Sequence, residues 1–422
     1  MPVHLIAFKF LLLFSSPAGE GPRGWTDFRG PATDGHAGKA TIPLQWSENN
    51  NVLWKTAIHD HGWSTPVVDQ GRIFITTATD DGRKMSLLCV DAKNGRVLND
   101  QEIFAVAKPQ PKHPLNSYAS PSPVVNDDHV FVHFGTYGTA GFDAESFEKV
   151  WERRDLKIDH IAGPGSSPIL YQDLLILHFD GGDRQFVIAL DQESGETVWE
   201  TERSTDYGKL VPDFRKAYST PIVIEVGGKP QLISCGAQRA FAYDPDTGDE
   251  IWSLRYEGFS MSSRPVFSDG IVYLNTGFNV PSLMAVRVDG MNDVTDSHVA
   301  WRYNKNMPTM PSPVLVDGRL FAISDAGILS CLDAKTGERI FRERVEGEYS
   351  ASLLAADSRI YMFNREGLST VIAAAPEFQV LAQNRLDDGF MSSPAVVGDT
   401  LFLRTKTHLY RIEEPAAKTP GS

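Results

Sequence analysis

"CLDAKTGERIF", residues 331–341, is one copy of a phrase that recurs in this chain, since "CVDAKNGRVL" begins at residue 89 and "ALDQESGETVW" at residue 189. In each copy an apolar run ends in Asp, and Gly follows four positions later. An Asp side chain can bond the backbone ahead of it in a tight turn, and Gly takes the positive φ that closes the turn. The phrase therefore predicts a strand, a tight turn and a second strand.

Four Asp–Gly pairs of this kind occur: Asp91 with Gly95, Asp191 with Gly195, Asp244 with Gly248, and Asp333 with Gly337. Equivalent carboxylates spread over separate repeats cannot converge on one substrate, so we interpret them as turn formers and not as catalytic acids.

The phrase belongs to a longer repeat of four short strands. Each unit starts with a Ser/Thr-Pro step, or its equivalent, followed by an apolar run, and the starts lie at Pro66, Pro123, Pro168, Pro221, Pro265, Pro313, Leu353 and Pro394. Four short strands recurring at intervals of about 40 to 60 residues are typical of propeller blades. The strand interiors are almost continuously apolar, as blades covered on both faces require. The sequence predicts an all-β, eight-bladed β-propeller of four-stranded antiparallel blades.

The last unit supplies only three strands, from Pro394 to about residue 412. "NVLWKTAI", residues 51–58, matches the fourth strand of the other units, with Trp54 in the position of Trp199. We therefore expect this N-terminal strand to close the ring, which removes an exposed edge. The expected organisation is an entry segment at 19–50, the propeller at 51–414 and a disordered tail at 415–422.

An aromatic residue follows most of the repeated turns. We expect it to dock the outer strand of a blade against the adjacent blade, which is a structural role. These residues are Trp151, Trp199, Trp252, Trp301 and Phe341.

Composition excludes one class of partner. The 422 residues include 40 Lys and Arg against 54 Asp and Glu, for a formal net charge of −14. Such a chain repels a phosphate backbone, so we expect no nucleic acid partner. The three cysteines, Cys89, Cys235 and Cys331, are far apart and predict buried thiols, not a disulfide framework or a metal site.

Residues 1–18, "MPVHLIAFKFLLLFSSPA", have the apolar stretch and small-residue end of a secretory signal peptide. The apolar stretch is too short to span a bilayer, and no longer one follows. The sequence predicts an exported, periplasmic or extracellular protein without a transmembrane segment.

The pattern "ALDxxTGxxxW" in residues 189–199, with a variant in 242–252, resembles the tryptophan-docking repeat of pyrroloquinoline-quinone (PQQ) type propellers. "WTDFRGPATDG", from Trp25, is similar to the entry segment of exported bacterial PQQ-like repeat proteins. That superfamily contains quinoprotein alcohol dehydrogenases and the non-enzymatic outer-membrane assembly factor of the BamB type. The resemblance implies the propeller fold and leaves two classes of function open.

The sequence departs from both classes. It has no adjacent cysteines, which alcohol-oxidising quinoproteins typically carry against the cofactor, and no motif matches their calcium ligands or catalytic carboxylates. The BamB-type proteins are commonly lipid-anchored at a Cys, and none stands near Ala18. These departures favour a non-catalytic protein without a membrane anchor, and no cofactor is assigned. PQQ with Ca²⁺ belongs to the alternative reading as an enzyme.

The residues before each Ser/Thr-Pro step are expected to meet at one mouth of the central channel, because the innermost strand of every blade starts there. Aromatic, Met, His and Arg side chains at this mouth would suit a flat conjugated ligand, a glycan or a partner peptide. The alternative is that they only plug the channel. The candidates are His59, His61, Trp63, His113, Tyr118, His160, Arg215, Tyr218, Met261, Arg264, Met310, Tyr349 and Met391.

The spacing of His59 and His61 places both rings on one side of a strand, with His113 and His160 in the next two units. No carboxylate partners accompany them at a recognisable spacing, so no metal site is assigned. The leading hypothesis is a monomeric, exported, non-catalytic propeller that binds a partner protein or a saccharide at the channel mouth. The alternative is a PQQ-dependent oxidoreductase acting on alcohols or sugars.

Overall fold

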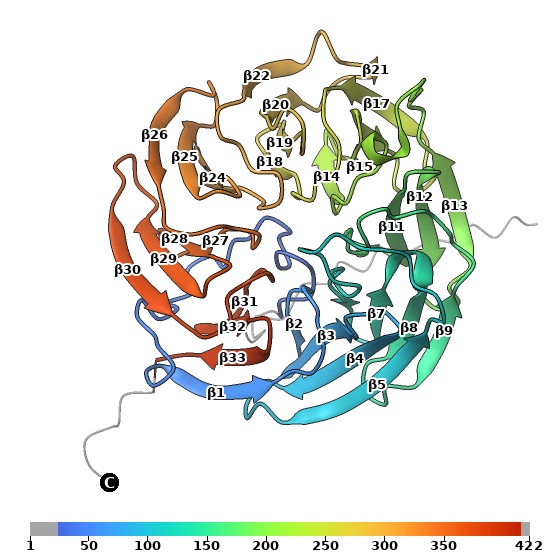
Figure 1. Cartoon of the computed structure of the whole chain (residues 1–422). Coiled ribbons are helices and arrows are strands. Elements are labelled where there is room, and N and C mark those ends of the chain that lie inside the picture. The colour runs from blue at the N-terminus through green and yellow to red at the C-terminus, as the bar shows by residue number, and fades with distance from the viewer. Residues whose placement is uncertain (1–23, 415–422) are drawn as a thin grey trace, which may run out of the picture.

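Eight β-sheets stand around a central channel in the computed structural model, which describes residues 24–414 (Figure 1). Seven sheets have four strands and one has five, and antiparallel neighbours make up each four-stranded blade. The prediction of an all-β, eight-bladed propeller is confirmed. The proposed signal peptide at 1–18 and tail at 415–422 lie outside the described residues.

The first four blades follow one another along the chain. Blade 1 contains β2 (Val67–Asp69), β3 (Arg72–Ala78), β4 (Lys84–Asp91) and β5 (Val97–Ala105). Blade 2 contains β6 (Val124–Val125), β7 (His129–His133), β8 (Thr139–Asp143) and β9 (Lys149–Arg153). Blade 3 contains β10 (Ile169–Tyr171), β11 (Leu174–Asp180), β12 (Gln185–Asp191) and β13 (Thr197–Glu202). Blade 4 contains β14 (Ile222–Val226), β15 (Lys229–Gly236), β16 (Arg239–Tyr243), β17 (Glu250–Arg255) and the added β21 (Asn292–Asp293).

The last four blades complete the circle. Blade 5 contains β18 (Val266–Ser268), β19 (Ile271–Asn275), β20 (Leu283–Arg287) and β22 (Val299–Tyr303). Blade 6 contains β23 (Val314–Val316), β24 (Arg319–Ile323), β25 (Ile328–Asp333) and β26 (Arg339–Arg344). Blade 7 contains β27 (Leu354–Ala356), β28 (Arg359–Phe363), β29 (Leu368–Ala373) and β30 (Val380–Arg385). Blade 8 contains β31 (Ala395–Val397), β32 (Thr400–Arg404), β33 (His408–Ile412) and β1 (Val52–Ala57).

The ring closes as expected from the sequence. Strand β1 pairs antiparallel with β33, with Val52 opposite Ile412 and Ala57 opposite His408. The two ends of the propeller therefore share one sheet, and β1 covers the outward edge of β33.

The repeated aromatic residue and the repeated glycine meet across blade boundaries. Trp199 of blade 3 donates from Nε1 to the carbonyl of Pro245 in blade 4, at 2.9 Å. A side chain at Gly248 would come within 2.6 Å of the Trp199 ring, and Gly248 has a φ of +78°. Glycine is therefore required here for two reasons: the turn needs a positive φ, and the indole leaves no room for a side chain. The same contact joins Trp54 to Gly95, Trp151 to Gly195, and Trp301 to Gly337.

Trp252 differs from this pattern. It is fully buried among residues of blades 4 and 5, but its Nε1 donates to Gln231 of its own blade at 3.1 Å. The third hairpin of blade 5 is enlarged here, and its segment β21 pairs parallel with β17. Trp252 therefore packs the outer strand of blade 4 against blade 5, as expected, but the insertion takes the place of the turn that the other indoles contact.

The Ser/Thr-Pro steps form hydrogen bonds between blades around the channel. The residue before the proline offers its hydroxyl to the backbone N–H of the equivalent residue one blade earlier. We call these hydroxyls the hydroxyl ring; its links are Thr65 to Ser122, Ser122 to Ser167, Ser167 to Thr220, Arg264 to Ser312, Ser312 to Ser352, and Ser352 to Ser393, at 2.9–3.1 Å.

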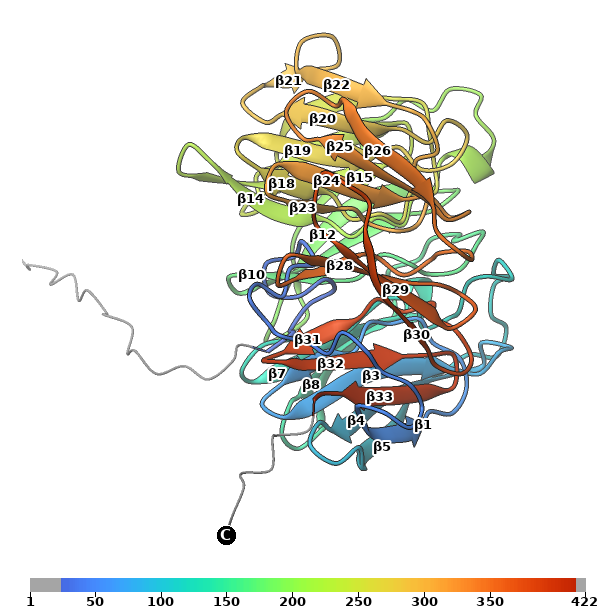
Figure 2. The same ribbon diagram turned by 90° about the vertical axis from the view of Figure 1, so that its left-hand side faces the viewer.

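The entry segment crosses the channel before it reaches β1, and its blue trace is visible at the centre of Figure 1 and beside the blades in the edge-on view of Figure 2. Trp25 pairs with Val68 of blade 1. Asp27 forms a buried ion pair with Arg264 of blade 5 at 2.8 Å. Arg29 donates to backbone carbonyls of blades 6 and 7. The segment therefore ties distant blades together and closes one end of the channel.

The docking contact predicts a large effect of Trp199→Ala. Removal of a buried indole and of the donor for Pro245 should lower the free energy of unfolding by about 3–5 kcal/mol. Val198→Ala is the matched control, because this neighbour is 52% exposed and should change stability by about 0.5 kcal/mol or less. Urea unfolding of both variants measures the difference, and equal losses would contradict the docking role.

Ring closure predicts that deletion of residues 51–58 lowers the melting temperature and promotes association, because β33 would then expose its edge. Thermal melts and size-exclusion chromatography test this. A deletion variant as stable and as monomeric as the parent would show that β1 is dispensable.

Candidate functional site

A cavity of about 660 Å³ opens at the channel mouth, on the side where the innermost strands begin. Phe28 of the entry segment lines it from below, and members of the hydroxyl ring line its wall. The cavity is therefore closed underneath and open only toward the mouth.

Apolar and aromatic side chains surround the upper part of the cavity. Phe259 and Phe278 line it, with ring centroids 6.4 Å apart, and Phe214 packs on Phe259 at 4.6 Å. Phe278 is 43% exposed, so part of this aromatic surface faces solvent. Such a surface at a cavity entrance is typical of a binding site.

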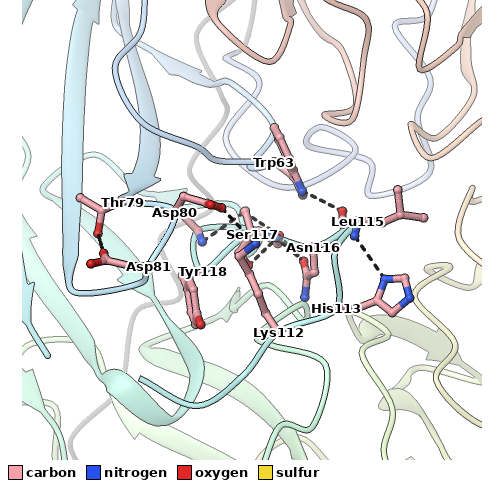
Figure 3. Close-up of polar contacts among 12 residues, drawn as sticks. Trp63, Thr79, Asp80, Asp81, Lys112, His113, Leu115, Asn116, Ser117 and Tyr118 are labelled. Carbon is pink, nitrogen blue, oxygen red and sulfur yellow. Dashed lines mark hydrogen bonds and ion pairs between the residues drawn. The ribbon is translucent and has the colours of Figure 1, made fainter. Parts of the chain in front are cut away.

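The loop between blades 1 and 2 forms the opposite rim (Figure 3). Trp63 donates from Nε1 to the carbonyl of Leu115 at 3.0 Å. Asn116 donates to the carbonyls of Ala162 and Pro164 at 2.8 and 3.0 Å, which fixes the loop to blade 3. The rim is thus held by hydrogen bonds on two sides.

Two lysines bring positive charge into the lining. Lys112 lies 3.2 Å from Asp80 and 5.7 Å from the centre of the Tyr118 ring. The side chain of Lys216 is only 4% exposed, and its ammonium contacts both the carboxylate and the carbonyl of Asp213. Asp213 is itself 53% exposed, so the ammonium is the more enclosed partner.

Five of the residues expected at the mouth line this cavity: Trp63, His113, Tyr218, Met310 and Met391. Tyr218 is mostly buried and donates to the carbonyl of His160 at 2.7 Å, so it also has a structural role.

Eight candidates lie outside the cavity lining: His59, His61, Tyr118, His160, Arg215, Met261, Arg264 and Tyr349. The first two are exposed beside blade 1, and His59 lies between Asp60 and Asp100 at 2.8 and 3.1 Å. Met261 belongs to the core of blades 4 and 5.

The other five are held by local or structural contacts. Tyr118 donates to the carbonyl of Gln110, and Tyr349 to that of Glu346. His160 accepts the N–H of Thr136 at 2.8 Å. Arg215 donates to the carbonyl of Leu210 at 2.7 Å. Arg264, paired with Asp27, anchors the entry segment.

Sequence reasoning missed several lining residues. Lys216 directly follows Arg215 in the sequence. Lys216 lines the cavity, whereas Arg215 does not. Phe28 lies in the entry segment, whose path across the channel has no periodic signal. The Ser/Thr-Pro steps mark the blade starts in the sequence, but they do not reveal that their hydroxyls line a cavity. The missed residues include Phe28, Lys112, Lys216, Phe259 and Phe278.

The cavity lacks the donor set that PQQ with Ca²⁺ would need. Asp213 is the only carboxylate in the lining, and it is paired with Lys216. Between residues 24 and 414 no cluster of three or more His, Cys, Asp or Glu side chains is arranged to hold a metal ion. The three cysteines are separate and buried, and burial raises the pKa of each thiol to about 12. These residues do not fit the group.

A second polar cluster lies buried at the boundary of blades 3 and 4. Arg203 contacts Asp180 at 3.0 Å and donates to Ser234 at 2.8 Å, while His178 lies 3.0 Å from Asp180. Burial alone would raise the pKa of Asp180, but the charge of Arg203 holds it below its usual value. All three charged or titratable side chains are enclosed, so this cluster stabilises the blade boundary and does not reach a ligand.

Eight compact blades, tryptophan docking and a closed channel define a PQQ-like propeller. Residues 45–209 and 183–415 match the family model described as outer membrane protein assembly factor BamB. Because the match covers most of the chain, the protein belongs to this family.

Individual relatives are distant. Over 174 residues the chain is 22% identical to the outer membrane protein assembly factor BamB of Yersinia pestis. The matches to two curated relatives span 49% and 41% of their length.

Solved structures agree on the fold alone. BamB from Moraxella catarrhalis superposes with a TM-score of 0.61 at 13% identity, over 86% of this chain and 99% of that chain. A quinohemoprotein alcohol dehydrogenase from Comamonas testosteroni gives 0.65 at 11% identity, over 95% and 82%. The fold is thus shared with an assembly factor and with a dehydrogenase and does not by itself decide the function.

Two buried histidines predict loss of stability in mild acid. Burial lowers the pKa of His160 to about 4 and, with the charges of His160 and His178, that of His133 to about 3. The unfolded chain has ordinary values near 6.5 and so binds more protons below that pH. Each histidine should cost about 2 kcal/mol of stability at pH 5.0 relative to pH 7.5.

Urea unfolding of His160→Gln at the two pH values tests this effect. Gln keeps an acceptor for the N–H of Thr136 but cannot gain a proton, so the loss between pH 7.5 and 5.0 should shrink by about 2 kcal/mol. His113→Gln, at the exposed rim, is the control. An unchanged pH dependence in His160→Gln would contradict the buried neutral state.

Proposed function

We propose that this protein is an exported, non-catalytic propeller that binds a segment of a partner protein at its channel mouth. The observation that carries the proposal is a cavity that opens only toward the mouth and has an aromatic rim, with its two lysines beside Asp80 and Asp213. A rim of this composition binds by burying apolar surface and offers no activated nucleophile or free acid–base pair.

Membership of the family supports this reading. The family is that of the outer membrane protein assembly factor BamB. Between residues 24 and 414 there is no helix long and apolar enough to cross a membrane. We propose export through removal of residues 1–18, and N-terminal sequencing of the mature protein tests that step.

Photocrosslinking tests the binding surface. A photoreactive phenylalanine derivative in place of Leu115, which is 40% exposed at the rim, should give adducts with one or a few exported proteins in native cells. The same derivative in place of Val198, which is 52% exposed on an outer strand, is the matched control and should give none of these adducts. The adducts should also decrease in Trp63→Ala, because the rim loop loses one of its two attachments and the mouth loses an aromatic side chain.

Two results would overturn the proposal. The first is the same set of adducts from both positions. The second is a stoichiometric quinone spectrum after incubation with PQQ and Ca²⁺, together with dye reduction driven by alcohols or sugars.

A further inference from the structure

The mouth cavity admits a ligand from one side only. The entry segment crosses beneath it, and the buried pair of Asp27 and Arg264 fixes that segment to blade 5. Phe28 forms the floor next to this pair. A chain cannot thread through the channel, so only a chain end or a single side chain can reach the inner wall.

The inner wall offers hydrogen-bond donors. The hydroxyls of Ser122, Ser167 and Thr220 each accept an N–H from the preceding blade, and those of Ser352 and Ser393 do so on the other side. Within residues 24–414 none of these five hydroxyls donates to another residue, so each O–H remains available. A group that only accepts hydrogen bonds fits this wall better than a sugar hydroxyl, whose own hydrogen needs an acceptor.

Lys216 adds charge to the same cavity. Its ammonium has three N–H groups and makes two contacts to Asp213, so one N–H has no oxygen acceptor, and the ammonium also lies 5.2 Å from the centre of the Phe259 ring. The side chain is almost fully enclosed, while the Asp213 carboxylate is half exposed to water. An anion in the cavity would therefore meet the ammonium with little intervening solvent.

Apolar groups stand above this polar wall. Trp63, Phe259, Met310 and Met391 line the cavity, and none carries a charge. A ligand that fills the site thus combines a carboxylate with an apolar body.

We propose that the cavity binds the C-terminal end of a polypeptide. The free carboxylate accepts from the hydroxyl ring and Lys216, and the last apolar side chain packs against Trp63 and Phe259. An internal acidic residue fits less well, because the chain on both of its sides would have to leave through the same mouth. This inference rests on the proposed function, namely that the partner is a protein.

The test compares two fluorescein-labelled pentapeptides that end in phenylalanine, one with a free C-terminal carboxylate and one with a C-terminal amide. Fluorescence anisotropy with the wild-type protein should give a Kd at least tenfold lower for the free acid, since the amide loses a charge-assisted contact. This comparison needs no variant and so does not depend on the folding of one.

Lys216→Met should reduce the acid-to-amide ratio to threefold or less. Lys229→Met is the matched control, because Lys229 is exposed at the start of β15 in the same blade and is absent from the cavity lining. Circular dichroism melts establish that both variants are folded. An unchanged ratio in Lys216→Met would overturn the role of this lysine.

Other outcomes separate the two proposals. Equal Kd values for acid and amide would overturn the carboxylate inference and leave a protein-binding mouth intact. Binding of 3-phenylpropionate as tightly as the peptide acid would overturn the polypeptide source. Binding of cellotriose with quenching of Trp63 fluorescence, and of neither peptide, would overturn both proposals.

Discussion

The contact between an indole and a turn glycine across a blade boundary sets the architecture. Each copy of the repeated sequence contains one turn glycine and one tryptophan. The tryptophan of one blade, however, contacts the glycine of the next blade. Blade 1 shows this by exception, because Asn99 stands opposite Cys89 where Trp199 stands opposite Ala189 in blade 3. The next turn, in blade 2, then carries Phe147 in place of glycine, at a φ of +63°. Where no indole packs on the turn, the residue at the glycine position can carry a side chain. The turn still keeps the positive φ.

Because every unit repeats the same turn and apolar runs, most of the fold could be predicted from the sequence. Strand order, the number of blades and closure by β1 all follow from a repeat whose every copy carries its own turn and apolar runs. The site could be predicted only in part. Trp63 and Met310 precede Ser/Thr-Pro steps and reach the mouth with their blades. Arg215 and Lys216 are adjacent, and the bond of Arg215 to Leu210 comes from an irregular loop that no periodicity describes.

The entry segment closes one end of the central channel and leaves the other end open. A propeller alone would leave a channel open at both faces, and residues 24–50 cover one face while their continuation completes blade 8. Closure of the ring and closure of the channel therefore depend on the same stretch of chain. Loss of β1 would disturb both the circular hydrogen bonding and the position of Phe28 beneath the cavity.

A single substitution in the repeat explains how this segment is held. Seven blades carry Ser or Thr before the innermost strand or its equivalent, whereas blade 5 carries Arg264. The hydroxyl ring is interrupted there, and between blades 4 and 5 Ser219 donates instead to the carbonyl of Ser263. The guanidinium of Arg264 is buried between blades and needs a negatively charged partner. Asp27 of the entry segment is that partner. The Arg at this one blade thus selects where the segment docks. The hydroxyl-bearing residues that line the cavity come from other blades: Ser122, Ser167, Thr220, Ser352 and Ser393.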